Sequence, residues 1–205
     1  MSWDKKLPSP LCAESKVICD ALRNSNHIEF PRFVVQPLST DLHVFCDASE
    51  RAFGAVAYAV CTQLRMSNLL TSKVRVSPQP RLTIPRLELT AIDLCVKLAH
   101  SLLNNPHLGL SSCTIWSDSE VAICWVTNNK STIPYVRNRV QAIRESEFTI
   151  FHVPTGTNPA DLLTRGLSAD KLKANDLWIH GPKFLLTKDY PFQKDFVSTG
   201  IEFTL

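Results

Sequence analysis

The sequence predicts a single α/β domain built on a mixed β-sheet, with additional segments at both ends. Three observations lead to this fold class. Two apolar, strand-like segments joined by a short polar link open the central region, as in an antiparallel hairpin. Strand-like and helix-like segments then alternate, which indicates crossovers between parallel strands. Finally, 205 residues with 44% hydrophobic and 20% charged side chains are enough to build one ordinary core.

The first half of the central region predicts a hairpin, a third strand and a long helix. Residues 41–49 and 52–61 have the composition of strands, and the Ser-Glu-Arg link between them favours a hairpin. Residues 72–77 alternate in the manner of a half-exposed strand. A helix with apolar residues at helical spacing follows from Thr83, a possible cap, to the Asn-Asn-Pro sequence at 104–106.

The second half repeats strands and helices. Ser117 or Asp118 could cap the first of its helices, and Gly166 would end the last. The element order predicts an antiparallel hairpin followed by parallel strands. The predicted elements are a strand at 112–118, helices at 119–128 and 134–146, a strand at 147–154 and a helix at 158–166.

Composition divides the chain into three expected segments. Residues 1–40 are rich in proline around one short helix near 11–24, and resemble an appendage or the tail of a preceding domain. Residues 41–167 form the α/β domain. Residues 168–205 are aromatic and basic without strong periodicity, and are interpreted as a linker or docking extension.

The composition also excludes several classes of protein. No apolar stretch is long enough to span a membrane, and the polar opening lacks the core of a signal peptide. We therefore expect an intracellular protein, cytoplasmic or nuclear, with no membrane partner. Seven scattered cysteines without a C-x-x-C pair are interpreted as small hydrophobic residues in a reducing compartment. The net charge of +3 permits a polyanionic partner without arguing strongly for one.

Four acidic residues stand at unusual places in these elements. Asp47 lies in an apolar strand, where a carboxylate is costly unless something pairs with it. Asp118 stands where a strand gives way to a helix, which is where open α/β sheets bind ligands. Glu88 lies between leucines on a helix, and Asp161 lies in a first helical turn. Each of the last three also has a structural explanation as a cap or a helix-end acid.

Brought together, four carboxylates would repel one another unless cations neutralised them. Oxygen ligands of this kind suit Mg²⁺ or Mn²⁺, which keep open positions for phosphate oxygens and water. Two such ions ~3.5–4 Å apart would activate a water and stabilise the leaving oxygen of a displacement at phosphorus. The pattern therefore indicates metal-dependent phosphodiester chemistry.

With these residues in view, the chain resembles the ribonuclease H family, and more narrowly the RNase H segment of BEL/Pao-type retrotransposon polyproteins. The matching motifs are FCDAS with AFGAVAY, SKVRVSP, TIPRLELTA, WSDSE, VRNRV, NPADLLTRG and WIHGPKFL. SWDKKLP and IEFPR are similar to the connection that precedes RNase H in those polyproteins. A short motif such as D-A-S is weak alone, but the ordered set covers roughly residues 1–186.

The resemblance implies a ribonuclease H-like fold, with a five-stranded mixed sheet flanked by α-helices. It places the family's four metal-binding, catalytic acids on Asp47, Glu88, Asp118 and Asp161. It implies hydrolysis of the RNA strand of an RNA–DNA hybrid with two Mg²⁺ (or Mn²⁺) ions, leaving a 3′-hydroxyl and a 5′-phosphate. It also implies reverse transcriptase and integrase as neighbours in the same polyprotein.

Substrate contacts are expected near the acids and on basic side chains. Ser49 and Ser119 could contact the 2′-hydroxyls that only RNA presents, although turn or cap roles are the commoner explanation. Trp178 and Phe184 could stack on bases, but packing on the domain is favoured. The basic residues expected to grip the hybrid, each with a solvated surface as the alternative, are Lys73, Arg75, Arg81, Arg86, Lys130, Arg137 and Arg139.

Two departures from the family pattern bear on activity. Cellular members carry a histidine in the loop before the fourth acid, whereas residues 155–157 here read Thr-Gly-Thr. His152 lies in the preceding strand and is interpreted as a strand residue. The basic helix of some members also has no room between residues 128 and 134. The departures predict modest turnover, and they keep open two alternatives: a non-catalytic nucleic-acid-binding or protein-docking module, and a remnant without a substrate.

Overall fold

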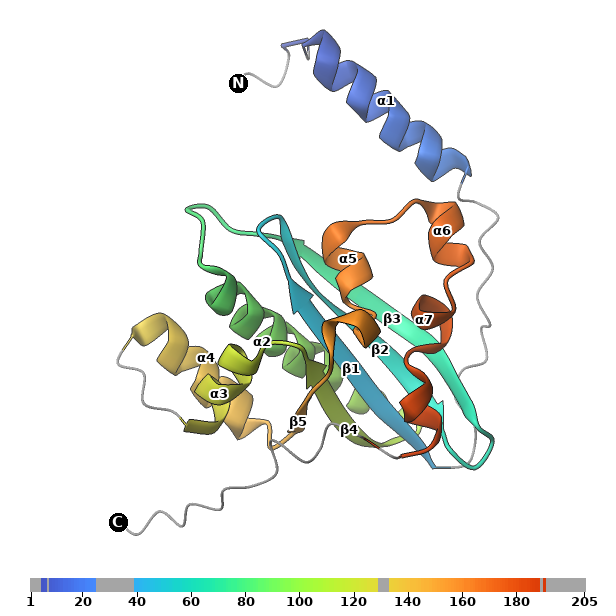
Figure 1. The fold of residues 1–205 in the computed structure, drawn as a ribbon, viewed down its shortest axis with the longest axis vertical. Coiled ribbons are helices and arrows are strands. Elements are labelled where there is room, and N and C mark those ends of the chain that lie inside the picture. The colour runs from blue at the N-terminus through green and yellow to red at the C-terminus, as the bar shows by residue number, and fades with distance from the viewer. Residues whose placement is uncertain (1–4, 7, 25–38, 129–132, 189, 191–205) are drawn as a thin grey trace.

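A five-stranded mixed sheet forms the centre of the computed structural model, which describes residues 5–6, 8–24, 39–128, 133–188 and 190 (Figure 1). The strand order is β3-β2-β1-β4-β5. Strand β1 pairs antiparallel with β2 and parallel with β4, as the sequence predicts. The strands are β1 (Thr40–Ala48), β2 (Ala52–Cys61), β3 (Met66–Val76), β4 (Leu110–Ser117) and β5 (Thr149–His152).

Helices cover both faces of this sheet (Figure 1). On one face, α2, α3 and α4 bury an aliphatic core. On the other, α5, α7 and the last 3-10 turn, η4, bury an aromatic core. The helices are α1 (Ser9–Asn24), α2 (Ile84–Leu103), α3 (Glu120–Asn128), α4 (Pro134–Glu145), α5 (Asp161–Arg165), α6 (Ala169–Lys173) and α7 (Asp176–His180), with 3-10 turns η2 (Pro106–Leu108), η3 (Thr155–Thr157) and η4 (Lys183–Leu186).

Strand β1 is buried on both of its faces. Val44 and Cys46 point into the aliphatic core, whereas Phe45 points into the aromatic core, because successive side chains of a strand alternate. Asp47 shares the face of Phe45, so its carboxylate lies on the side of the sheet that α5 covers.

Several element bounds differ from the prediction. Strand β3 begins at Met66 rather than 72, because the hairpin with β2 continues to a turn in which Arg65 has a positive φ of 51°. Strand β5 begins at Thr149 rather than 147, because Glu147 has a positive φ of 56° that is incompatible with a strand. The short helix α5 begins at Asp161 rather than 158.

The segment after residue 167 packs on the sheet. Trp178 is 5% exposed and Leu185 is fully buried in the aromatic core, which confirms the expectation for Trp178. Tyr58 of β2 donates a hydrogen bond to the carbonyl oxygen of Trp178 at 2.9 Å. Gly181, which follows α7, has a φ of +70°, and a Cβ there would lie 3.0 Å from Leu185 Cδ1 and 3.3 Å from the Tyr58 ring. The domain boundary at 167 stays a prediction.

The interpretation of the cysteines as small hydrophobic residues of the core holds for only some of them. Cys46, Cys61 and Cys95 are buried, whereas Cys12, Cys19 and Cys124 are exposed. Among the described residues, none of the helices combines the length and apolar character needed to cross a bilayer.

Candidate metal centre

Asp47 is the most buried of the four predicted acids. It lies one residue before the end of β1 and is 8% exposed. Burial, and after it repulsion from Asp118 and Asp161, raise the pKa of Asp47 to about 6. The Thr164 hydroxyl opposes this shift by donating a hydrogen bond to Asp47 Oδ2. A buried carboxylate with a raised pKa and two acidic neighbours is a group that a bound cation would stabilise.

Asp118 reaches Asp47 through the parallel pairing of β1 and β4. Cys46 is in register with Ser117, so the next residue of each strand, Asp47 and Asp118, emerges at the same end of the sheet. Asp118 precedes α3, but it does not cap that helix. Ser119 does so by accepting a hydrogen bond from the backbone N–H of Ala122 at 3.1 Å, so the predicted cap at Ser117 or Asp118 is wrong.

Asp161 is brought to the same place by the loop before α5. The fully buried Asn158 donates from Nδ2 to the carbonyl oxygen of Cys46 at 2.9 Å and accepts from the N–H of Ala160 at 3.1 Å. These bonds fasten the loop to β1 beside Asp47. The sequence interpretation misses this role of Asn158, although the NPAD motif contains it.

Arg165 partly offsets the charge of Asp161. Its Nη2 lies 3.1 Å from Asp161 Oδ1, which is ion-pair distance. The pKa of Asp161 is raised, first by burial and then by Asp118, while Arg165 acts in the opposite direction. Arg165 is exposed, so its screening in water weakens this offset.

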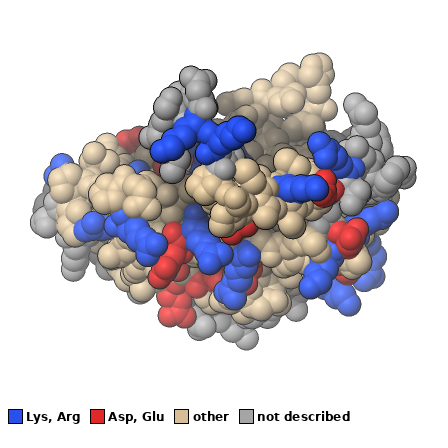
Figure 2. Space-filling model, turned by 90° about the horizontal axis from the view of Figure 1, so that it is seen from above, with Lys and Arg blue, Asp and Glu red and all other residues tan. Residues whose placement is uncertain are grey.

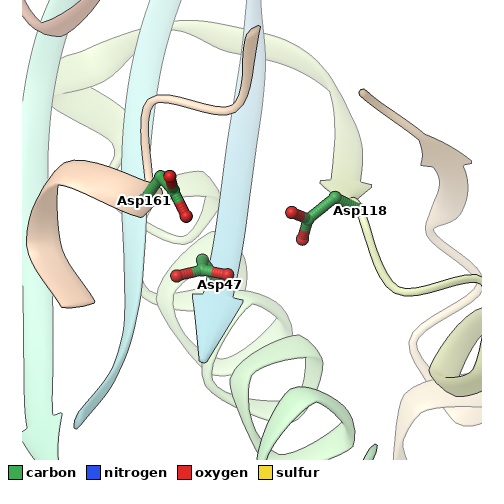
Figure 3. Close-up of side chains that lie close together, drawn as sticks. All are labelled: Asp47, Asp118 and Asp161. Atoms are coloured by element: carbon green, nitrogen blue, oxygen red, sulfur yellow. The ribbon is translucent and has the colours of Figure 1, made fainter. Parts of the chain in front are cut away.

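The three aspartates converge near the ends of the neighbouring strands β1 and β4 (Figure 3). Each offers a carboxylate oxygen, and these oxygens lie within 4.8 Å of one another. They come from β1, the end of β4 and the start of α5, three elements far apart in the sequence. Hard oxygen donors in a small, partly buried group are the ligands that Mg²⁺ and Mn²⁺ take. The donor set therefore fits a divalent cation.

Glu88, the fourth predicted acid, lies outside this group of three. Its Oε2 accepts a hydrogen bond from the Ser119 hydroxyl. The pKa of Glu88 is raised by burial and by the charge of Asp118, so the two carboxylates are near neighbours. The cap of α3 thus also holds the carboxylate on α2.

The two predicted substrate serines both use their hydroxyls within the protein. Ser119 bonds to Glu88, and Ser49 donates to the carbonyl oxygen of Thr164 at 3.2 Å while accepting from the N–H of Ala52 at 3.2 Å. Ser49 therefore ties the hairpin turn to α5. A contact with a 2′-hydroxyl stays a prediction for both.

The predicted hybrid-gripping residues are spread over the surface. Lys73 and Arg137 are exposed and Arg86 is half-buried. Arg139 is stacked on the Tyr135 ring, with its guanidinium carbon 3.7 Å from the ring centre. Figure 2 shows Lys and Arg side chains interspersed with acidic ones on one face. Lys130, and with it most of the segment from 128 to 134, lies outside the described residues.

Residues 155–157, where the family's histidine would stand, form the 3-10 turn η3. His152 is a half-buried strand residue, as predicted, but β5 ends at His152 rather than at the predicted residue 154.

Comparison with protein families gives one match. The model described as "Pao retrotransposon-like RNaseH-like domain" matches residues 1–119, more than half of the chain. The matched range contains Asp47, Glu88 and Asp118, and ends before Asp161. No curated protein matches the chain.

Among solved structures, RNase H1 from the archaeon Halobacterium salinarum is 19% identical, with a TM-score of 0.48 over 61% of this chain and 95% of that one. LC11-RNase H1 in complex with an RNA/DNA hybrid is 14% identical, with a TM-score of 0.47 over 64% and 99%. The foamy virus protease-reverse transcriptase is 13% identical, with a TM-score of 0.40 over 73% of this chain and 27% of that one.

Proposed function

The chain belongs to the Pao retrotransposon-like RNaseH-like domain family, and from this premise we propose that it is a hybrid ribonuclease. Its substrate is an RNA–DNA hybrid, of which it hydrolyses the RNA strand. Asp47, Asp118 and Asp161 hold divalent cations, two Mg²⁺ or Mn²⁺ ions in our proposal, and Glu88 joins them when substrate and metal are present.

The convergence of three partly buried carboxylates carries this proposal. Their oxygens lie within 4.8 Å of one another, and among the described residues the one ion pair they make is that of Asp161 with the exposed Arg165. Grouping like charges away from water is unfavourable unless cations are bound. A purely structural role would not require the arrangement, because well-packed apolar residues would stabilise this end of the sheet better.

When bound, the metal ions supply an activated water and stabilise the leaving oxygen of the phosphodiester. The protein residues hold the ligands in place. Thr164 fixes one oxygen of Asp47, and Ser119 fixes one oxygen of Glu88. Asn158 fastens the Asp161 loop to β1. Residues 155–157 contain no histidine, so this loop has no imidazole that could carry protons. We therefore expect modest turnover.

The wider context belongs to the same proposal. A retrotransposon RNase H acts on the hybrid made by a reverse transcriptase, so we place this chain in a polyprotein with reverse transcriptase and integrase parts. Its site of action is then the cytoplasm or nucleus. Residues 41–167 form the catalytic domain, with residues 1–40 as a connection-like segment and 168–205 as an extension.

The direct test is cleavage of a hybrid whose RNA and DNA strands carry different labels. With Mg²⁺ present, the full chain should cut the RNA strand alone and leave 5′-phosphate ends. Asp47→Asn and Asp118→Asn should lose this activity, while Asp170→Asn, which changes an exposed acid on α6, should keep it. A folded wild-type chain no more active than Asp47→Asn would contradict the proposal.

A binding module without catalysis is the second candidate. The position of Glu88, held by Ser119 outside the group of three aspartates, favours it. It would bind the hybrid with an affinity that falls steeply with salt, and would cut neither strand. The same labelled hybrid distinguishes the two candidates.

A further inference from the structure

A second concave site lies on the opposite face of the sheet from the carboxylate of Asp47. It is a pocket of about 630 Å³ between the end of β3, residues 78–82, α2 and α4. Lys73 and Arg75 of β3 line it, and their β2 partners, Ala55 and Phe53, contribute to the aliphatic core under α2. This volume is within the usual range of small-molecule sites, roughly 300–1,000 Å³.

Helix α2 keeps this pocket separate from the metal centre. Thr90 and Lys97 line the pocket and lie two and nine positions after Glu88. At 3.6 residues per turn, both lie roughly 160–180° around the helix from Glu88. The two sites therefore use opposite sides of the same helix.

The pocket carries an excess of positive charge. Four cations line it, Lys73, Arg75, Lys97 and Arg139, against one carboxylate. That carboxylate, Asp93, is paired with Lys97 at 2.7 Å. Within the described part of the chain, the other three cations have no carboxylate at ion-pair distance. Cations gathered in a concave site attract an anion.

Arg139 has hydrogen-bonding groups that the described residues leave unused. Its Nη1 donates to the carbonyl oxygen of Tyr135 at 3.3 Å, whereas neither Nε nor Nη2 has an acceptor among the described residues. Nε is buried and out of reach of a ligand, but an anion in the pocket would accept from Nη2.

The remaining walls are apolar and aromatic. The guanidinium carbon of Arg139 lies over the Tyr135 ring, and the Tyr135 hydroxyl is hydrogen-bonded to the Thr90 hydroxyl at 2.7 Å. The apolar wall is made by Phe53, Val76, Pro78, Pro80, Leu82 and Leu94. An inorganic anion would leave this wall exposed to water, whereas a flat apolar body with an attached anion would cover it.

We propose that this pocket binds a nucleoside phosphate, with its phosphate on Lys73, Arg75 and Arg139 and its base against Tyr135 and the apolar wall. The ligand is either a free mononucleotide or one unpaired nucleotide of a strand. The pocket contains none of the carboxylates of the metal centre. Nucleotide binding can therefore be tested independently of the proposed cleavage activity.

Calorimetric titration of the full chain in EDTA tests the proposal, with adenosine 5′-monophosphate and a five-nucleotide single strand as probes. Saturable binding at one site is expected for at least one probe. Arg139→Gln should weaken it roughly tenfold or more, because a charged hydrogen bond is lost. Lys73→Gln should weaken it as well. Lys171→Gln, an exposed cation on α6, and Asp47→Asn should leave it unchanged.

Comparison of the probes identifies the source of the ligand. Binding of the monophosphate indicates a free nucleotide, and binding of the strand alone indicates an unpaired nucleotide. The proposal is overturned if neither probe binds, or if Arg139→Gln with an unchanged melting temperature keeps full affinity. Inorganic phosphate or an oligo-aspartate peptide binding as tightly as the nucleotides would overturn it too.

Discussion

At the scale of single residues, the candidate site depends on neutral hydroxyls that hold charged groups. Thr164 is 6% exposed, and its hydroxyl donates to Asp47 while its carbonyl oxygen accepts from Ser49. Ser119 plays the corresponding part for Glu88 and also caps α3. Such partners orient metal ligands and commonly affect metal affinity or activity by roughly 10–100-fold.

Replacing Thr164 with valine tests this positioning role. Thr164→Val keeps the shape of the side chain but removes the donor, so Mn²⁺ affinity and hybrid cleavage should both fall, by about 10-fold or more. Thr164→Ser keeps the hydroxyl and should recover most of both. If the valine variant binds Mn²⁺ as tightly as the wild type, Thr164 serves packing alone.

The raised pKa of Asp47 predicts how stability depends on pH in metal-free buffer. The pKa of Asp47 is about 6 in the folded chain against 3.8 as its ordinary value. Between these values the folded state binds a proton that the unfolded state has released. The contribution of Asp47 to the free energy of unfolding therefore falls as the pH rises from about 4 to about 6, and stays low above pH 6.

Asp47→Asn isolates that contribution. Denaturant unfolding in EDTA at several pH values should show wild type losing stability relative to Asp47→Asn as pH rises through this window. Saturating Mg²⁺ should reduce the difference, because bound cations favour the ionised carboxylate. Parallel pH profiles for the two proteins would contradict the assignment.

At the scale of elements, the close approach of α5 to β2 fixes the position of Asp161. Gly54 of β2 is in register with Asp47, and a Cβ at Gly54 would lie 3.0 Å from Leu163 Cδ1 of α5 and 3.2 Å from the carbonyl oxygen of Lys73. A glycine inside a strand often marks such an approach. A side chain at this position would push α5, and with it Asp161, away from Asp47.

Gly54→Ala should therefore destabilise the fold by about 1–3 kcal/mol through overpacking and weaken Mn²⁺ binding. Leu163→Ala makes room for the added methyl group, so the double variant should be more stable than the sum of the single effects predicts. Chemical denaturation of the four proteins measures this coupling. Additive effects would show that α5 does not rest on Gly54.

At the scale of the whole molecule, the C-terminal segment completes the aromatic core. Trp178 and Leu185 are buried with Phe45, Tyr58 and Trp116 of the sheet. The same core packs on the face of β1 to which Asp47 belongs. The segment therefore stabilises the fold and the strand that carries Asp47.

Trp178→Ala should cost about 3–5 kcal/mol of unfolding free energy, as is typical for a buried aromatic residue. Lys171→Ala, an exposed change in the same segment, should stay within about 0.5 kcal/mol of wild type. Urea unfolding monitored by circular dichroism gives both values. A loss near zero for Trp178→Ala would mean that the segment is dispensable.

Most of the fold could be predicted from sequence because its signals are local. The strand at 52–61 and the end of the long helix at Leu103 follow from apolar patterning and from the Asn-Asn-Pro stop. The first half of β3 was missed because MSNLLT lacks alternation, and β2 pairing alone makes it a strand.

The four acids were found from their unusual positions and from the family resemblance. Their supporting residues could not be predicted, because the partners are distant in sequence. Thr164 lies 117 positions from Asp47, and Asn158 lies 112 positions from Cys46. Glu88 lies outside the group of three aspartates and is held there by the Ser119 hydroxyl. The local sequence indicates only a cap or turn role for Ser119.

The central claim is that three converging aspartates form a divalent cation site. Calorimetric titration of the metal-free full chain with Mn²⁺ tests it directly, with Asp118→Asn, Asp161→Asn and the exposed control Asp170→Asn alongside. We predict saturable Mn²⁺ binding to the wild type and the control, and a large loss of affinity in both site variants. Equal Mn²⁺ binding by all four proteins, or none by the wild type, would contradict the claim.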